Sequence, residues 1–213
     1  MKLLQLYNKL FNCFGPQYWW PAKSKFEIII GAILTQQTSW KQVEKAIKNL
    51  RNTHLLNPNA LANKNTKFIE TCIKPTAFYK QKTIRIKKFS KYLIKKYGTV
   101  NKFLKSVARE ELLEMEGIGK ETADSILLYA ANRPIFVVDA YTFRITNQMF
   151  GYSFKSYDEL QKFFESQLPK SVKIYKEFHA LLVELGKRYC RSKSKCIKCF
   201  LNKECNFALK HRE

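Results

Sequence analysis

The hydrophobic positions of this chain recur at helical spacing over most of its length. Between residues 25 and 36 they are Phe26, Ile29, Ile30, Ile33 and Leu34, which would share one face of a helix. The same spacing predicts helices over residues 1–14, 41–51, 66–73, 80–96, 157–168 and 173–190. Seven glycines and six prolines are few, as in mostly helical proteins. We therefore expect an all-α fold.

A pair of short helices around two glycines forms the centre of the pattern. Residues 108–115 and 120–131 each have helical spacing, and Gly117-Ile118-Gly119 between them predicts a tight turn. Backbone N–H groups at the start of the second helix would point outward, where the helix dipole adds partial positive charge. Such a helix–hairpin–helix unit suits a DNA phosphate. An ordinary corner between two helices is the alternative.

An aspartate follows the next apolar run. Asp139 comes directly after residues 135–138, in the segment VVDAYTFR, and a further helix is predicted from there to Gly151. A carboxylate at a helix start serves either as an N-cap or as a catalytic acid or base.

These motifs together resemble a known family. GIGKETADSILLYA followed by PIFVVDAYTFR resembles the helix–hairpin–helix DNA glycosylase superfamily, in its endonuclease III group, and looks most like the 3-methyladenine branch. The resemblance implies that Asp139 is the catalytic aspartate. It also implies that the residues at the hairpin bind DNA, namely Gly117, Ile118, Gly119, Lys120 and Thr122.

One position departs from the endonuclease III pattern. Members that also cut the strand carry a lysine two residues after the second hairpin glycine, and here that position is Glu121. Lys120 lies about 100° around the helix from it. Because a carboxylate cannot form a Schiff base, the resemblance implies a monofunctional glycosylase. Glu121 is retained as a candidate catalytic residue, with a simple dipole-stabilising charge as the alternative.

Three tryptophans and two glutamines complete the predicted site. Trp19, Trp20, Pro21 and Trp40 would wall a base pocket, in which a cationic alkylated purine gains about 1–2 kcal/mol from stacking. Covering the core from outside and packing at a helix start are the alternatives. The segment from Leu34 to Trp40 matches the family's glutamine loop, whose polar side chain fills the gap left by a flipped base. Gln36 is the first candidate and Gln37 the second.

The charge agrees with a polyanionic partner. The chain has 39 Lys and Arg against 17 Asp and Glu, a formal net charge of +22. The predicted helix over residues 80–96 carries eight cations, Lys82 among them, without an acidic residue, and could contact the DNA backbone or simply face solvent. No apolar run approaches the roughly 20 residues needed to span a membrane. We expect a cytoplasmic, nucleoid-associated monomer without a targeting signal.

Four of the six cysteines are clustered. Cys190, Cys196, Cys199 and Cys205 have the spacing Cys-x5-Cys-x2-Cys-x5-Cys, which can hold either iron–sulfur or zinc. The arrangement resembles the C-terminal 4Fe–4S loop of endonuclease III, although the first gap is usually one residue longer there. We expect Cys13 and Cys72 to be small core residues. The three histidines show no ligand spacing and receive no catalytic role.

The prediction is a two-lobed helix–hairpin–helix DNA glycosylase fold with a C-terminal iron–sulfur cluster loop and a DNA groove between the lobes. Residues 22–134 would form one domain, and residues 1–21 with 135–213 the other. The activity implied by the resemblance is removal of alkylated purines from double-stranded DNA by base flipping and water attack. A glycosylase for oxidised pyrimidines or mismatched bases, and a DNA-binding protein without enzyme activity, are the alternatives.

Overall fold

The computed structural model describes residues 1–191 and 193–211, and the regular elements in these ranges are all helical. This confirms the predicted all-α fold. The chain divides into two compact units. Trp20–Asn132 forms the first, here called the central unit, and Met1–Trp19 with Arg133–Glu213 forms the second, here called the terminal unit. The predicted boundaries lie two residues further along the chain at each change of unit.

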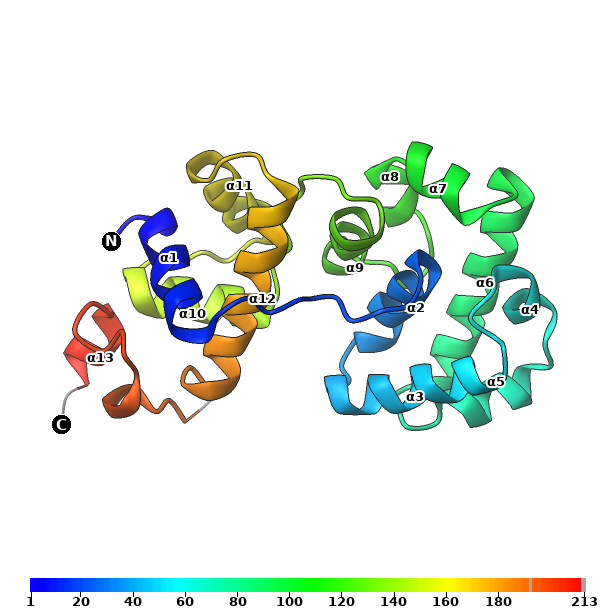
Figure 1. Ribbon diagram of the computed structural model, residues 1–213, viewed down its shortest axis with the longest axis horizontal. Coiled ribbons are helices and arrows are strands. Elements are labelled where there is room, and N and C mark those ends of the chain that lie inside the picture. The colour runs from blue at the N-terminus through cyan, green and yellow to red at the C-terminus, as the bar shows by residue number, and fades with distance from the viewer. Residues whose placement is uncertain (192, 212–213) are drawn as a thin grey trace. The chain divides into compact units, whose positions relative to one another are not determined.

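Nine helical elements of the central unit follow one another with short connections (Figure 1). In chain order they are α2 Lys25–Thr35, α3 Trp40–Asn52, α4 Pro58–Asn63, α5 Thr66–Ile73, α6 Tyr79–Tyr97, α7 Val100–Ser106, α8 Arg109–Leu113, α9 Lys120–Ser125 and the π-helical turn η1 Ile126–Ala130. Their bounds lie within one or two residues of the predicted ones for α2, α3, α5 and α6.

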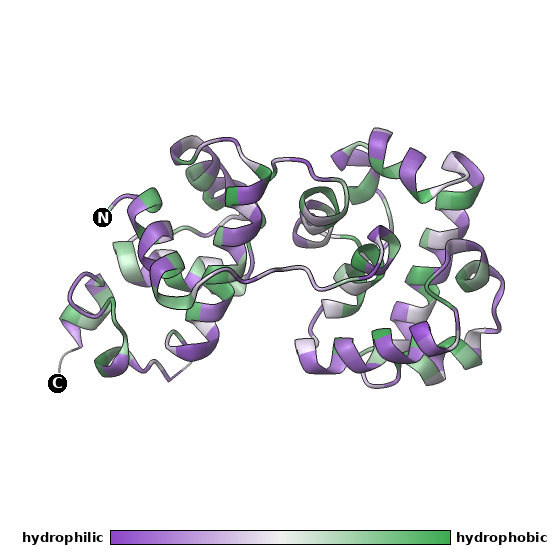
Figure 2. Ribbon diagram, viewed as in Figure 1, coloured by the Kyte–Doolittle hydropathy of each residue, from purple (hydrophilic) through white to green (hydrophobic). Residues whose placement is uncertain are grey.

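Helix α2 lies in the core of the central unit. It packs against α3, α6, α9 and η1 and is buried around most of its surface. Ser24 caps its first turn by accepting a hydrogen bond from the backbone N–H of Glu27. Helix α3 behaves differently, because Figure 2 shows hydrophilic and hydrophobic residues alternating along it. Only its face with Val43, Ala46 and Leu50 is buried.

The second helix of the hairpin unit changes type along its length. The predicted helix over residues 120–131 is present as a helical segment from Lys120 to Ala130, but α9 passes at Ser125 into a π-helical turn that the sequence did not predict. All five residues of this turn are buried, including the large ring of Tyr129. A π turn accommodates one extra residue per turn and is found most often at functional sites.

The terminal unit is built around α12 (Figure 1). This helix, Val172–Arg188, packs against α1, Leu3–Phe14, and α10, Ala140–Phe150. The remaining elements are α11 Tyr157–Gln167, the 3-10 turn η2 Cys196–Lys198 and α13 Asn206–Lys210.

The segment that leads to Asp139 is held firmly. Phe136 stacks on Phe164 of α11, with ring centroids 4.3 Å apart. Its backbone N–H donates to Glu165 Oε1 at 2.8 Å, and its carbonyl accepts from Gln161 Nε2 at 2.7 Å. Side chains of α11 therefore satisfy an extended segment that lacks a sheet partner in the described structure.

Two further observations concern burial. Cys72 is buried as predicted, whereas Cys13 is exposed, so the prediction that Cys13 is a core residue is wrong. Cys13 lies seven residues after the buried Leu6 and therefore on the same face of α1, but it stands in the last turn, and its exposure shows that this face is not covered at the end of the helix. Across the ranges that the structure describes, no helix is both long and apolar enough to cross a membrane.

A buried ion pair joins α8 to α9, and we predict that breaking it destabilises the central unit. Arg109 Nε and Nη2 lie 2.6 and 2.9 Å from the two carboxylate oxygens of Asp124, which is fully buried. Arg109→Met leaves that carboxylate without its guanidinium, so the free energy of unfolding should fall by about 3 kcal/mol in urea denaturation. Lys88→Met, which breaks the exposed pair with Glu116, is the control and should leave the free energy of unfolding nearly unchanged. Equal losses in the two variants would contradict the prediction.

Candidate functional site

Of the two glycines in the hairpin turn of the central unit, only one has a left-handed backbone conformation. Gly117 has φ +79°, and a Cβ atom there would lie 2.1 Å from Arg85 Nε. Gly119 is extended, with φ −88°, and caps α9. It is exposed, and the space where its Cβ atom would lie is open. The side chain of Ile118 is buried, and its N–H donates to the carbonyl of Met115 at 3.0 Å. Within the turn, the backbone of Gly119 is therefore the part that a phosphate can approach.

The first turn of α9 presents the two charged residues singled out in the sequence. Lys120 and Glu121 are both exposed, and Glu121 lies where an acidic side chain complements the helix dipole. Thr122 is placed differently. Its side chain is buried and its hydroxyl accepts from Gln36 Nε2 at 3.0 Å, so the predicted contact of this side chain with DNA is not supported.

The glutamine loop, defined here as residues 36–39, is tied to the hairpin by its first residue. Gln36 Nε2 also donates to the carbonyl of Gly117 at 2.8 Å, and Gln36 Oε1 accepts from Arg85 Nη1 at 3.0 Å. The amide of Gln36 is therefore fully engaged within the central unit. Gln37 is exposed and has φ +51°, an unusual conformation for a glutamine. The geometry reverses the predicted order of the two glutamines as candidates to enter DNA.

A second exposed residue with left-handed backbone lies beside this loop. Phe78 has φ +55° and 58% of its surface exposed. The preceding residue, Ala77, donates its N–H to Thr38 Oγ1 at 3.1 Å, which links Phe78 to the glutamine loop. Strained residues of this kind cluster at functional sites. Sequence reasoning missed Phe78, because its exposure and backbone angle depend on the fold.

The buried ammonium of Lys82 donates hydrogen bonds to the same loop. Its Nζ donates to the carbonyls of Leu34 and Gln36, at 2.8 and 2.7 Å, and to Thr38 Oγ1 at 2.7 Å. Only 1% of this lysine is exposed, so the prediction that it belongs to a DNA-facing cationic surface is wrong. Burial, together with the nearby charge of Arg85, lowers the pKa of Lys82 to about 8.

Three aromatic rings group together in the central unit. Trp20 meets Trp40 edge to face, with centroids 5.2 Å apart, and meets Tyr129 of the π turn at 5.4 Å. A Cβ atom at Gly31 would lie 3.2 Å from the Trp20 indole, so this glycine makes room for the ring. Pro21 is exposed in the segment before α2. Sequence reasoning predicted the two tryptophans and missed Tyr129.

Trp19 belongs to the terminal unit and stacks on a histidine. Its ring is parallel to that of His179 within 1°, at a centroid distance of 5.4 Å. The ammonium of Lys187, an exposed residue of α12, lies 5.8 Å from the indole centroid. His179 is buried in the middle of α12, where helical spacing alone gave it no function.

Asp139 has the first of the two roles that the sequence left as alternatives. It caps α10, because Oδ1 accepts from the N–H of Thr142 at 2.7 Å and from its hydroxyl at 2.8 Å. The other oxygen, Oδ2, lies 3.6 Å from His179 Nε2. Burial by itself raises the pKa of this carboxyl, but the contacts from His179 and Thr142 outweigh burial and hold the pKa below its ordinary value. The side chain remains partly open to solvent, with 14% exposed.

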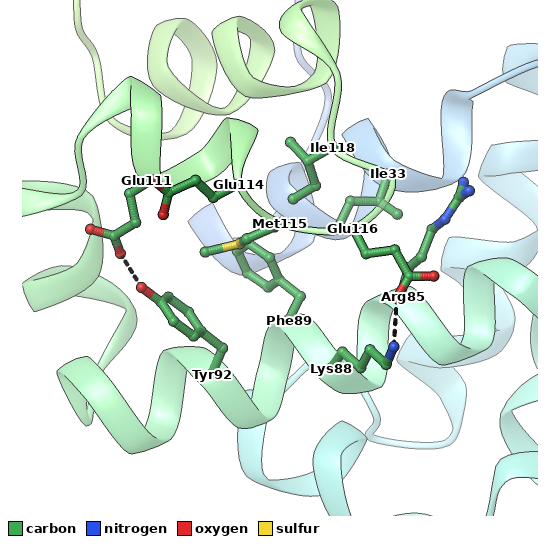
Figure 3. Close-up of a pocket in the computed structure, with 10 residues that line it drawn as sticks. All are labelled: Ile33, Arg85, Lys88, Phe89, Tyr92, Glu111, Glu114, Met115, Glu116 and Ile118. Atoms are coloured by element: carbon green, nitrogen blue, oxygen red, sulfur yellow. Dashed lines mark hydrogen bonds and ion pairs between the residues drawn. The ribbon is translucent and has the colours of Figure 1, made fainter.

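A cavity of about 360 Å³ lies under the hairpin of the central unit (Figure 3). Met115 and Phe89 occupy the middle of its lining, between the Tyr92–Glu111 hydrogen bond at one end and the Lys88–Glu116 ion pair at the other. Its lining includes no predicted base-pocket residue. The cavity is therefore not the base pocket predicted from the tryptophans.

The four clustered cysteines line one small cavity of the terminal unit. Cys190, Cys196, Cys199 and Cys205 face it together with apolar residues that include Met149, Leu185 and Leu201. Burial, followed by the proximity of the other three cysteines, raises the pKa of Cys190 to about 12, so its thiolate requires a cation for stability. The donor set thus suits a thiolate-ligated centre. Residues 1–191 and 193–211 contain no group of three or more His, Cys, Asp or Glu side chains in a geometry that could hold a single metal ion.

Arg144 has a structural contact next to this cluster. Its Nε donates to the carbonyl of Cys190 at 2.7 Å, and its guanidinium lies over the ring of Tyr141. It therefore ties α10 to the start of the cysteine loop and makes no described contact with Asp139.

Comparison with known proteins identifies the family. The model of the HhH-GPD superfamily base excision DNA repair proteins matches residues 30–170. A protein of Methanocaldococcus jannaschii named "Putative DNA repair glycosylase" is 43% identical over 209 residues, covering 95% of each chain. Endonuclease III of Thermotoga maritima is 30% identical over 183 residues, covering 85% of this chain and 83% of its own.

A solved structure agrees with these relatives. The 3-methyladenine DNA glycosylase of H. pylori, in a crystal structure with bound 1,N6-ethenoadenine, is 31% identical with a TM-score of 0.82. The match covers 88% of this chain and 98% of that one. The family resemblance inferred from the hairpin and Asp139 segments is thereby confirmed, and the chain belongs to the HhH-GPD superfamily of base excision DNA repair proteins.

Proposed function

We propose that this chain is a monofunctional DNA glycosylase that removes alkylated purines of the 3-methyladenine type from double-stranded DNA. One observation carries the proposal: the carboxylate of Asp139 and the indole of Trp19 both contact the ring of His179. An anion and an aromatic face thus lie next to each other in the terminal unit. An alkylated purine carries positive charge, which favours stacking on the indole. The sugar becomes positive as the base leaves, and the carboxylate stabilises that charge.

Asp139 would act on the sugar and on water. Oδ1 accepts two hydrogen bonds from Thr142, which fix the direction of the carboxylate, and the nearby His179 helps to keep it ionised. An ionised carboxylate stabilises the oxocarbenium-like sugar and accepts a proton from the attacking water. Because a 3-methylated adenine is already cationic, it leaves without a strong general acid.

The aromatic residues support an alkylated purine as the substrate. Trp20, Trp40 and Tyr129 form a mutually packed group, and Trp19 is held flat by His179. Flat, electron-rich faces select a cationic base by stacking more than by hydrogen bonds. The likeness to an H. pylori 3-methyladenine glycosylase that binds an ethenoadenine adds support. The endonuclease III relative favours a second candidate, a glycosylase for oxidised pyrimidines.

The lack of lyase activity rests on the first turn of α9. Glu121 is exposed there, at the position where strand-cutting members of the family carry their lysine. A carboxylate cannot attack the sugar to form a Schiff base. Glu121 itself is proposed to complement the helix dipole and not to take part in the reaction.

Two exposed residues of the central unit are proposed to fill the gap left by the flipped base. Gln37 and Phe78 both have left-handed backbones, and the bond from Ala77 to Thr38 joins their segments. An amide can bond to the orphaned base, and an apolar ring can enter between base steps. The hairpin would bind a phosphate through the exposed backbone of Gly119 and the first turn of α9.

We also propose that Cys190, Cys196, Cys199 and Cys205 hold a 4Fe–4S cluster and not zinc. Their spacing and their shared cavity support this assignment. Such a cluster supplies structural cross-linking when bound. The exposed basic residues around it, Lys187, Arg191, Lys193 and Lys195, would then be fixed as a phosphate-binding surface.

Release of free base tests the proposal directly. Duplex DNA that contains 3-methyladenine should lose that base to the wild-type protein, as followed by chromatography. Asp139→Asn should slow release about 10²–10³-fold, because asparagine still caps α10 but carries no charge. An unchanged melting temperature is the control for folding. Faster release from thymine-glycol DNA would favour the oxidised-pyrimidine candidate, and release that is unaffected by Asp139→Asn would refute the assigned mechanism.

Borohydride trapping tests the absence of lyase chemistry. The wild-type protein should yield abasic DNA that breaks only after alkali, and no covalent adduct. Glu121→Lys places an amine at the family's lysine position, so we expect a borohydride-trapped adduct on gel electrophoresis. Lys120→Arg is the matched control and should behave like the wild type. An adduct with the wild-type protein would mean that another amine attacks the sugar.

Substitution of the two proposed gap-filling residues tests their role. Gln37→Ala and Phe78→Ala should each slow single-turnover base release by about tenfold or more, since an unfilled gap favours return of the base to the stack. Fluorescence of 2-aminopurine beside the lesion reports the flipped state. Gln81→Ala and Phe68→Ala, which alter exposed residues of α6 and α5, are matched controls. Defects of equal size in the controls would show that the effect is not specific.

A further inference from the structure

Lys82 is an unusual residue for the first turns of a helix. The side chain is almost fully buried, and its ammonium group reaches the end of a different helix, α2. An ammonium has three N–H donors, and each has an acceptor here: the carbonyls of Leu34 and Gln36 and the hydroxyl of Thr38. The lysine is therefore completely satisfied by neutral oxygens of one short segment.

These oxygens need such a partner. Helix α2 ends at Thr35, so the carbonyls near its end lack the N–H groups of a following turn. They also carry the negative end of the helix dipole, which favours a cation. The ammonium of Lys82 thus supplies donors to the carbonyls at and beside the C-cap residue, Gln36, and it fixes the direction in which the chain leaves that helix.

The contacts of Lys82 extend to both proposed gap-filling residues. The Thr38 hydroxyl that it binds also accepts the N–H of Ala77, next to Phe78. The backbone N–H of Lys82 donates to the carbonyl of Phe78 at 3.0 Å. Gln37 lies between the two loop residues, Gln36 and Thr38, that the ammonium contacts. The side chain of Lys82 therefore contacts the glutamine loop directly, and through the Thr38 hydroxyl it is linked to the segment that carries Phe78.

A further set of hydrogen bonds, made by Arg85 and Gln36, joins the glutamine loop to the hairpin. Arg85, one turn after Lys82 on α6, donates to Gln36 Oε1, and Gln36 Nε2 donates to the carbonyl of Gly117. The glutamine loop is consequently held by α6 on one side and by the hairpin on the other.

We propose that Lys82 is a positioning residue that holds Gln37 and Phe78 ready to enter DNA before DNA is bound. The inference rests on the gap-filling role given to these two residues in the proposed function. Preorganisation of this kind lowers the entropy lost when the loop meets its target. Without the ammonium, the carbonyls at the end of α2 lose these donors, and the strained backbone of Gln37 can relax.

The protonation state of Lys82 gives the inference a distinctive signature. The charged group that acts on it is Arg85 of its own helix, and the atoms that α2 and the loop present to it are neutral oxygens. Because the pKa is lowered to about 8, the amine loses one of its three donors as the pH rises through that value. Gap filling should therefore weaken above about pH 8, where Asp139 does not titrate.

The first experiment measures the free protein. Amide hydrogen exchange at residues 36–39 should be at least about tenfold faster in Lys82→Met than in the wild type, because the loop loses its donors. Lys91→Met, which removes an exposed lysine of the same helix, is the matched control and should leave exchange unchanged. Unchanged exchange in Lys82→Met would overturn the inference, whatever the substrate of the protein. If Lys82→Met does not fold, Thr38→Val removes one partner and the bridge to Ala77, and wild-type exchange in that variant overturns the inference instead.

The second experiment measures gap filling and base release on 3-methyladenine DNA. Lys82→Met should slow single-turnover release about tenfold with binding to undamaged duplex within about twofold, and adding Gln37→Ala should cause little further loss. Wild-type release should decline above about pH 8, whereas Lys82→Arg should keep its rate there because its charge persists. Wild-type rates and pH profile in Lys82→Met would overturn the inference. Two other outcomes would instead refute the proposed function. In both, hydrogen exchange is faster in Lys82→Met, but either the wild type and all variants fail to release base, or Gln37→Ala has no effect on base release.

Discussion

The carboxylate of Asp139 makes two kinds of contact with different oxygens, and the structure around it depends on one of them. One oxygen closes the first turn of α10 through Thr142, and the other faces His179. The cap fixes where the carboxylate lies, and the buried segment before it, held by α11, fixes where the cap lies. A carboxylate that is also a helix cap is held in place, because its movement costs a hydrogen bond at the start of the helix. Of the two roles that the sequence left open, the structure shows the cap, and the proposed catalytic role is compatible with it.

Two neighbouring tryptophans belong to different units. Trp19 packs on α12 through His179, whereas Trp20 packs with Trp40 and Tyr129 of the central unit. Consecutive residues in an extended segment point in opposite directions, so a Trp-Trp pair supplies an aromatic ring to each unit. Each ring is held by edge-to-face or stacked neighbours, which makes it a defined surface and not a loose cover.

The sequence predicts those features that depend on local pattern. The periodicity of residues 25–36 and 66–73 gives α2 and α5 almost to the residue, and Asp139 is found at a helix start as its position indicated. The failures depend on distant partners. Lys82 shares by spacing the face of α6 that carries the buried Ile86 and Phe89, but its partners, the carbonyls near the end of α2, cannot be found from the sequence. His179 similarly gains its importance from Asp139 and Trp19, which lie far away in the chain. The π turn is hidden because five apolar residues fit either kind of helix.

The close approach of Gly31 to Trp20 means that the size of one residue in α2 constrains the position of the aromatic group. Nothing larger than hydrogen fits at that point of α2 unless the indole shifts by a few tenths of an ångström. Because Trp20 also touches Trp40 and Tyr129, such a shift is passed on to both rings. In the proposed function these rings select the base, so a substitution at Gly31 would alter that selection through the backbone of a core helix and not through a residue proposed to contact the base.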